Sequence, residues 1–150
     1  MGHTYTNLLT HIIFSTKDRL PYLRAERQRD VFTYIGGIVR ELKGSAININ
    51  GVADHVHMLV RLPASLPVAK TVEIVKTNSS RWIHESRVLH RTFAWQTGYG
   101  AFSVSESRAD EVSRYILNQA EHHRKITFQE ELIAFLQRAR IPFDERYLWK

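Results

Sequence analysis

The sequence predicts an α+β fold in which an antiparallel sheet carries helices on one face and further helices follow at the C-terminal end. Three observations predict it: hydrophobic patterns in the order β-α-β-β-α-β, a tight hairpin signal between two central strands, and two helical patterns after the last strand. At 150 residues the chain is long enough to bury its own core, and no linker interrupts it. A single domain over residues 1–150 is therefore expected.

The first half of the chain predicts a strand, a helix and a hairpin. Residues 5–16 are rich in β-branched and aromatic residues and precede a polar turn, as a first strand would. Apolar residues at helical spacing predict an amphipathic helix over residues 25–43. The two strands Ser45–Val52 and His55–Leu62 follow, and the short connection Ala53-Asp54 between them favours an antiparallel hairpin.

The second half predicts a helix, a short strand and two more helices. A proline at the first position and an apolar stripe predict a helix over residues 67–83, and residues 101–104 could form a fourth strand. Ser105 offers an N-cap for one helix that runs to about His123. Thr127 and Glu130 then form a capping-box pattern before the last helix. The whole order is that of the ferredoxin-like, or RRM-like, split arrangement.

Such a sheet leaves its second face free if the helices pack on the first. In the strand His55–Leu62 the apolar residues alternate with a more polar set, so one face belongs to the core and the other carries His55, His57 and Arg61. We expect this second face to be open, as in sheets that bind nucleic acid.

Composition narrows the class of function. There are 21 Lys and Arg against 15 Asp and Glu, a net charge of +6, which suits a DNA backbone or an anionic membrane surface. No apolar run approaches the roughly 20 residues of a membrane-spanning helix, so no membrane role is expected. The absence of cysteine excludes disulfides, thiolate zinc sites and a cysteine nucleophile. No secretory signal is evident, so we expect a cytoplasmic protein.

Two short patterns carry the chemistry. In His55-Val56-His57 the two imidazoles share one face of a strand and can lean toward one ion. Tyr115 and Gln119 are four positions apart and would share one face of a helix. Taken separately, the histidines are more often solvated or hydrogen-bonded side chains, and a helical tyrosine is more often a packing residue.

Together the patterns resemble a known family. The His55-Val56-His57 strand, the segment from Trp95-Gln96 to Phe102-Ser103-Val104, and Tyr115 with Gln119 and His122-His123 resemble the single-tyrosine HUH transposases of small bacterial insertion sequences. These form the two-hundred and six-hundred-five group and include relatives that act on repetitive extragenic palindromes. The resemblance covers nearly the whole chain, and it rests on the order and spacing of the motifs rather than on any one of them.

The resemblance implies a function and a site. His55, His57 and Gln119 would bind a divalent ion, Mg²⁺ or Mn²⁺, and Tyr115 would be the nucleophile. The enzyme would cleave and rejoin single-stranded DNA at hairpin-marked ends through a 5′-phosphotyrosine. A homodimer is also implied, with each active site built either within one chain or from both. The preference of imidazole for later transition ions favours tighter binding of Mn²⁺ than of Mg²⁺.

Other residues have candidate roles in DNA binding. Trp95, Tyr99 and Phe102 could stack on unpaired bases, although core packing is the commoner role for Trp95 and Phe102. His122 could be an extra ligand or a proton carrier, or simply a polar helix terminus. Seven basic residues could line a groove for the backbone: Lys17, Arg19, Lys70, Lys76, Arg81, Arg108 and Arg114.

Two other functions fit the same residues. A non-catalytic single-strand binding module would use the open sheet and would bind DNA without cleaving it. A metal-dependent phosphodiesterase would let water attack, and Tyr115 would only pack. The three hypotheses differ in whether a covalent protein–DNA adduct forms.

Overall fold

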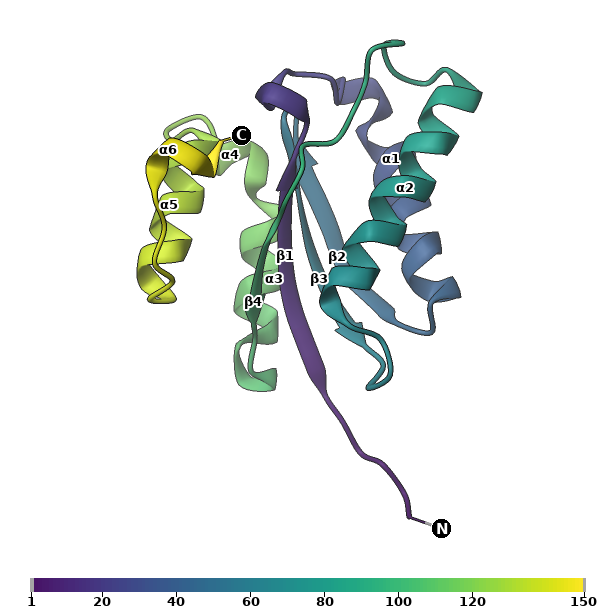
Figure 1. Cartoon of the computed structure of the whole chain (residues 1–150), viewed down its shortest axis with the longest axis vertical. Coiled ribbons are helices and arrows are strands. Elements are labelled where there is room, and N and C mark those ends of the chain that lie inside the picture. The colour runs from purple at the N-terminus through teal and green to yellow at the C-terminus, as the bar shows by residue number, and fades with distance from the viewer. Residues whose placement is uncertain (1, 150) are drawn as a thin grey trace.

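The computed structural model describes residues 2–149 as a four-stranded antiparallel sheet between two layers of helices (Figure 1). The strands lie in the order β2-β3-β1-β4 and are β1 (Leu8–Ser15), β2 (Ser45–Val52), β3 (His55–Leu62) and β4 (Gly100–Ser103). The helices are η1 (Lys17–Arg19), α1 (Ala25–Glu41), α2 (Val68–Ser86), η2 (Glu106–Arg108), α3 (Ala109–Leu117), α4 (Gln119–His122), α5 (Phe128–Arg138) and α6 (Glu145–Leu148). The ferredoxin-like prediction is confirmed.

The strands follow the predicted pattern closely. β2 and β3 have the predicted ends and pair as an antiparallel hairpin. β1 begins later than predicted, because Leu8 pairs with Leu62, the last residue of β3, and earlier residues have no strand to pair with. Tyr5, for example, is 88% exposed.

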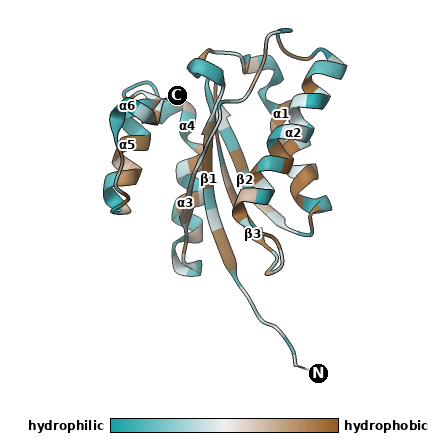
Figure 2. Cartoon of the chain, in the orientation of Figure 1, coloured by the Kyte–Doolittle hydropathy of each residue, from teal (hydrophilic) through white to brown (hydrophobic). Residues whose placement is uncertain are grey.

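The main core lies between the sheet and the helices α1 and α2. Ile12 and Phe14 of β1 and Val56, Met58 and Val60 of β3 are fully buried in it. Hydrophobic residues run along these strands and along the two helices that pack on them (Figure 2). The alternation predicted for β3 is therefore confirmed on this face.

Replacing Ile12 with Ala should destabilise the protein by about 2 to 5 kcal/mol, because it leaves a cavity in a closely packed core. Ile47 is the matched control, since it is 38% exposed on the edge strand β2. Its replacement with Ala should cost less than about 1 kcal/mol. Urea unfolding of both variants measures the difference, and equal losses would contradict this description of the core.

The second face of the sheet is covered, and the expectation of an open face is wrong. Leu9 of β1, Leu59 of β3 and Ile116 of α3 form a second buried cluster. The amphipathic helix α3 supplies the apolar stripe that covers the sheet, since burial of apolar surface is favourable. Figure 1 shows α3, α4, α5 and α6 on this side and α1 and α2 on the other.

The single helix predicted from Ser105 to about His123 is interrupted. It consists of η2, α3 and α4, with a break at Asn118. At this break Nδ2 of Asn50, on β2, donates to the carbonyl oxygens of Ile116 (2.9 Å) and Leu117 (3.1 Å). A continuous helix would use those carbonyls for its own N–H groups, so the side chain from the sheet favours the interruption.

Within residues 2–149, no helix combines the length and the apolar character that crossing a bilayer requires.

Candidate active site

His55 and His57 lie on the side of β3 that faces α3, α4 and α5. Both side chains are fully buried, and their ring centroids are 5.1 Å apart. The hairpin that precedes them is tight: a Cβ atom at Gly51 would overlap the carbonyl oxygen of His55. Glycine therefore allows β2 to approach the strand that carries both histidines.

Each histidine is oriented by a partner at its Nδ1 atom. Oδ1 of Asp54 lies 2.6 Å from Nδ1 of His55, and Nε2 of His11 lies 2.8 Å from Nδ1 of His57. Both Nε2 atoms consequently point into the space between β3 and α5. Partners of this kind fix the ring orientation of histidines that bind metals.

Two further side chains converge on the same space. Oε1 of Glu131, on α5, lies 2.8 Å from Nε2 of His57, 3.3 Å from Nε2 of His55 and 3.1 Å from Nε2 of His123. Nδ1 of His123 donates to the carbonyl of Ile126 at 2.8 Å, and the tautomer with its proton on Nδ1 has a lone pair on Nε2. That buried nitrogen has no hydrogen-bond partner among residues 2–149.

These four side chains form a possible metal centre. The ligand atoms of His55, His57, His123 and Glu131 all lie within 4.8 Å of one another. Imidazole nitrogen and carboxylate oxygen are ordinary ligands of divalent ions, and an unpaired Nε2 facing a carboxylate is suited to one. The chemistry of the donor set therefore fits a divalent ion.

Tyr115 and Gln119 reach the cluster from the helical side. The Tyr115 hydroxyl donates to Oε2 of Glu131 and lies 3.0 Å from Nε2 of His122. Oε1 of Gln119 is 3.2 Å from Nε2 of His55, and its amide nitrogen is 3.3 Å from Oε2 of Glu131. The strand motif and the helix motif found in the sequence thus meet at one carboxylate.

The charges in the cluster follow from burial and these contacts. Burial lowers the pKa of His55, but hydrogen bonds to Asp54 and Glu131 more than offset it and raise the value to about 9. Burial lowers the pKa of His57 to about 4 and that of His11 to about 3. The pKa of Glu131 lies far below its usual range, since the imidazoles around it outweigh the opposing effect of burial. In the metal-free protein, therefore, a protonated His55 lies beside the Glu131 carboxylate.

Tyr115 is far from ionised in this environment. Burial and the adjacent Glu131 carboxylate raise the pKa of its phenol well above the ordinary value. Protonated phenol is a poor nucleophile, so it needs a nearby cation or a base to become reactive.

Glu131 and His11 were not identified from the sequence, although each left a signal. Glu131 lies between Phe128 and Phe135 in the apolar stripe of α5, and a carboxylate in an apolar stripe must have a buried partner. His11 shares a face of β1 with Leu9, which points toward the second cluster.

The basic residues proposed for DNA binding do not gather in one groove. Lys70, Lys76 and Arg81 belong to α2, which packs on the opposite face of the sheet from the histidines. Lys76 also holds the loop after α2, since its Nζ donates to the carbonyls of Gln96 and Gly98. Burial lowers the pKa of Lys76 to about 8.

The other four basic residues lie nearer to the helices of the second face. Lys17 and Arg19 are in η1, directly after β1. Arg108 ends η2 and pairs with Glu111 at 2.9 Å, and Arg114 is exposed on α3. Of the seven, Lys17 and Arg19 thus follow the strand that carries His11.

Of the three candidate stacking residues, two pack within the protein and one is exposed. Trp95 packs edge-on against Phe14 and Phe93, and its indole N–H donates to Ser79. Phe102 stacks on Phe135 of α5, with ring centroids 5.3 Å apart. Packing roles are therefore supported for these two rings, whereas Tyr99 is 43% exposed.

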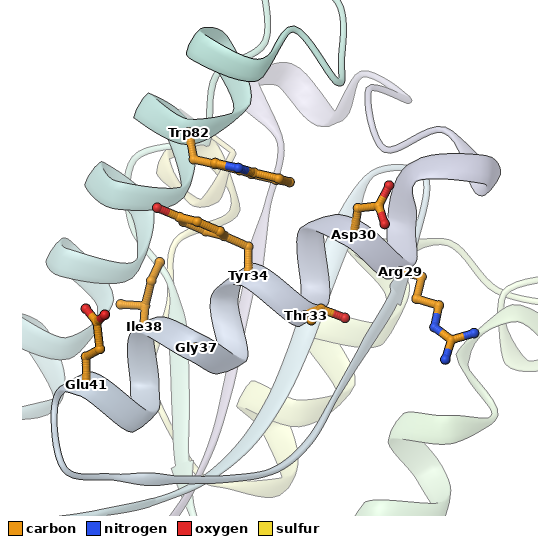
Figure 3. A pocket seen from close by; sticks show the side chains of 8 residues that line it. All are labelled: Arg29, Asp30, Thr33, Tyr34, Gly37, Ile38, Glu41 and Trp82. Carbon is orange, nitrogen blue, oxygen red and sulfur yellow. The ribbon is translucent and has the colours of Figure 1, made fainter.

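A hollow of about 490 Å³ lies between α1 and α2, on the far side of the sheet (Figure 3). The rings of Tyr34 and Trp82 stack there, with centroids 4.4 Å apart. None of the metal-binding candidates borders it. It is therefore separate from the candidate active site.

Comparisons with known proteins identify the family. The family described as "Transposase IS200 like" matches residues 4–119. The chain is 28% identical over 134 residues to the transposases for insertion sequence element IS200 of Salmonella typhimurium and Salmonella typhi, which covers 83% of this chain and 84% of each relative.

Two solved structures share the fold. A crystal structure assigned to a transposase from Deinococcus radiodurans R1 matches with a TM-score of 0.62 and 22% identity, over 79% of this chain and 96% of that one. A REP-associated tyrosine transposase bound to a REP hairpin matches with a TM-score of 0.60 and 13% identity, over 82% and 73%. Because the family match covers residues 4–119, most of the chain, the protein belongs to the IS200-like transposase family and is a DNA transposase.

Proposed function

We propose that this transposase cleaves and rejoins single-stranded DNA with Tyr115 as its nucleophile, beside a divalent ion. The observation that carries the proposal is the contact of the Tyr115 hydroxyl with Glu131, whose other oxygen faces three imidazoles. Phenol, carboxylate and histidines thus share one site. A labelled single strand from the DNA that flanks the gene, incubated with the protein and Mn²⁺ and resolved on a denaturing gel, tests it.

The proposed ligands of the ion are His55, His57 and Gln119, as predicted, together with His123 and Glu131. When bound, a divalent ion supplies a positive charge that polarises a phosphodiester oxygen. Because the set of ligands is rich in nitrogen, it supports tighter binding of Mn²⁺ than of Mg²⁺, and either ion would activate the enzyme. His123 and Glu131 lie beyond residues 4–119, so the family match does not cover them.

The chain's own residues would prepare the attack. Glu131 holds the phenol, and His122 lies 3.0 Å from the phenol oxygen while its side chain is 31% exposed. His122 can therefore take up the phenol proton and release it to solvent. As the phenol oxygen bonds to phosphorus, the bond from phosphorus to the 3′-oxygen breaks, and that oxygen takes a proton from water. The products are a 5′-phosphotyrosine and a free 3′-hydroxyl, and another 3′-hydroxyl can reverse the step.

The proposed substrate is a single strand that bears hairpins, and the chain acts as one domain in the cytoplasm. The structural relative bound to a REP hairpin supports a substrate of this kind. A homodimer is part of the proposal. The contacts of Tyr115 and Gln119 with the cluster of their own chain favour an active site built within one chain.

Replacing Glu131 with Gln should weaken Mn²⁺ binding by about 10- to 100-fold, because the site loses a carboxylate that faces three imidazoles. Glu130→Gln is the matched control, since the neighbouring carboxylate only caps α5. Calorimetric titration with Mn²⁺ measures both affinities. Equal affinities for the two variants would show that Glu131 is not a ligand.

A further inference from the structure

A groove beside the metal-ligand cluster is bordered by basic residues that the proposed mechanism does not use. We call it the Arg19 groove; it has a volume of about 550 Å³ and is bordered by Arg19, Asp54, His123, Arg124, Lys125 and Thr127, among others. It reaches the cluster at two points, since the Asp54 carboxylate orients His55 and Nε2 of His123 faces Glu131. Anything bound in this groove would therefore lie next to the cluster.

Arg19 has an unused donor in this place. Its Nη1 atom is buried and has no hydrogen-bond partner among residues 2–149. The guanidinium lies over the ring of Trp149, 5.4 Å from its centroid, a contact that holds the group without using an N–H donor. A buried donor without an acceptor is unfavourable, and an anion in the groove would supply the missing acceptor.

The backbone presents Arg19 in a strained turn. Asp18 and Arg19 have φ angles of 55° and 56°, in the left-handed region that residues other than glycine rarely adopt. The turn is tied to the start of β3, because the Thr16 N–H donates to the Asp54 carbonyl at 2.9 Å and the Thr16 hydroxyl donates to the Leu20 carbonyl at 2.6 Å. Arg19 is thereby fixed relative to His55, and such strain is found where a side chain must be presented.

The Arg19 groove differs in charge from the hollow next to it. Arg124 and Lys125 add basic side chains beside Arg19, with Arg124 paired to Glu121 at 3.4 Å, and the Asp54 carboxylate is engaged by Nδ1 of His55 at 2.6 Å. The neighbouring hollow of about 340 Å³, bordered by Ser15, Gln96 and others, has no charged side chain in its described lining. The phosphate backbone of a DNA strand that extends from the cluster would therefore be attracted to the Arg19 groove rather than to this hollow.

We propose that the Arg19 groove binds a phosphate of the DNA strand beside the one that is cleaved, with Arg19 donating to it and Lys125 adding charge. The proposal rests on the proposed function, since the phosphate belongs to the DNA strand that Tyr115 is proposed to cleave. Neither Tyr115 nor His122 borders the groove, which meets the cluster at His123 and, through Asp54, at His55, so the groove would hold a part of the strand beside the phosphate that Tyr115 attacks.

A scan with neutral phosphates tests this contact. Single methylphosphonates are placed one at a time around the cleavage point of a fluorescein-labelled flank strand, and binding is measured by anisotropy in the Tyr115→Phe background. When Arg19 is present, a methylphosphonate at one position next to the cleaved phosphate should weaken binding about 10-fold. With Arg19→Gln, that position should have no further effect, whereas the other positions should keep theirs, and the log-log salt slope should fall by about 0.7.

Arg27→Gln is the matched control, because this exposed arginine lies on α1, on the far side of the sheet. It should leave the whole scan unchanged. If Arg19→Gln does not fold, as judged by circular dichroism, Lys125→Gln tests the same position with the same expected loss. Equal responses of the parent and the groove variants at every position would overturn the proposal. The scan measures binding and tests only the groove. Formation of a covalent adduct by the wild type is a separate measurement that tests the proposed function itself.

Discussion

Replacing Tyr115 with Phe is expected to abolish the covalent adduct between the protein and single-stranded DNA, with a loss of at least about 10³-fold in the rate of its formation. The variant lacks the one oxygen that can bond to phosphorus, whereas the ring keeps its contacts with His122 and Phe135. Folding and DNA binding should therefore be retained. A denaturing gel with labelled flank DNA and Mn²⁺ measures the adduct.

Tyr34→Phe is the matched control for this experiment, since Tyr34 lies on α1 and stacks on Trp82, away from the cluster. Its adduct should equal that of the wild type. A shifted band that persists with Tyr115→Phe would mean that another residue is the nucleophile. Cleavage without any shifted band in the wild type would favour the phosphodiesterase, and binding without cleavage would favour the non-catalytic module.

Replacing His57 with Ala should lower the rate of cleavage by more than about 100-fold, and EDTA should do the same to the wild type. His57 contributes the imidazole closest to Glu131, and its loss leaves the ion with an incomplete set of ligands. Single-turnover cleavage in Mn²⁺ measures the rate, and calorimetry shows whether the ion still binds.

His90→Ala is the control for His57→Ala, because His90 is exposed and its imidazole hydrogen-bonds to the nearby Thr92, away from the cluster. It should cleave like the wild type. Full activity of His57→Ala, or of the wild type in excess EDTA, would remove the metal from the mechanism and leave the histidines as structural residues.

The sequence predicts the sheet well because its signals are local. The hairpin of β2 and β3 has a short turn, β3 has an apolar residue at every second position, and Thr127 forms its capping box with Glu130 as expected. The convergence of His57 and Tyr115 could be expected only from the family resemblance, since it depends on contacts between distant segments. That the two do meet at Glu131 supports the resemblance.

The features that were missed depend on tertiary contacts or are too short to leave a periodic pattern. The break at Asn118 arises from Asn50 on a strand far away in the sequence, which no helical periodicity can reveal. The short helix α6 (Glu145–Leu148) has only one turn, too short for a periodic signal. The open face was a mistake because the apolar stripe around Ile116 had to be buried somewhere, and the sheet next to the histidines was the available surface.

The account depends most on the identity of the residue that bonds to DNA. Wild-type protein is incubated with flank single strand and Mn²⁺, digested with protease and nuclease, and mapped by mass spectrometry. The peptide that contains Tyr115 should carry the added nucleotide on its phenol oxygen. A nucleotide on any other residue, or no modified peptide when the DNA has been cleaved, would contradict the central claim.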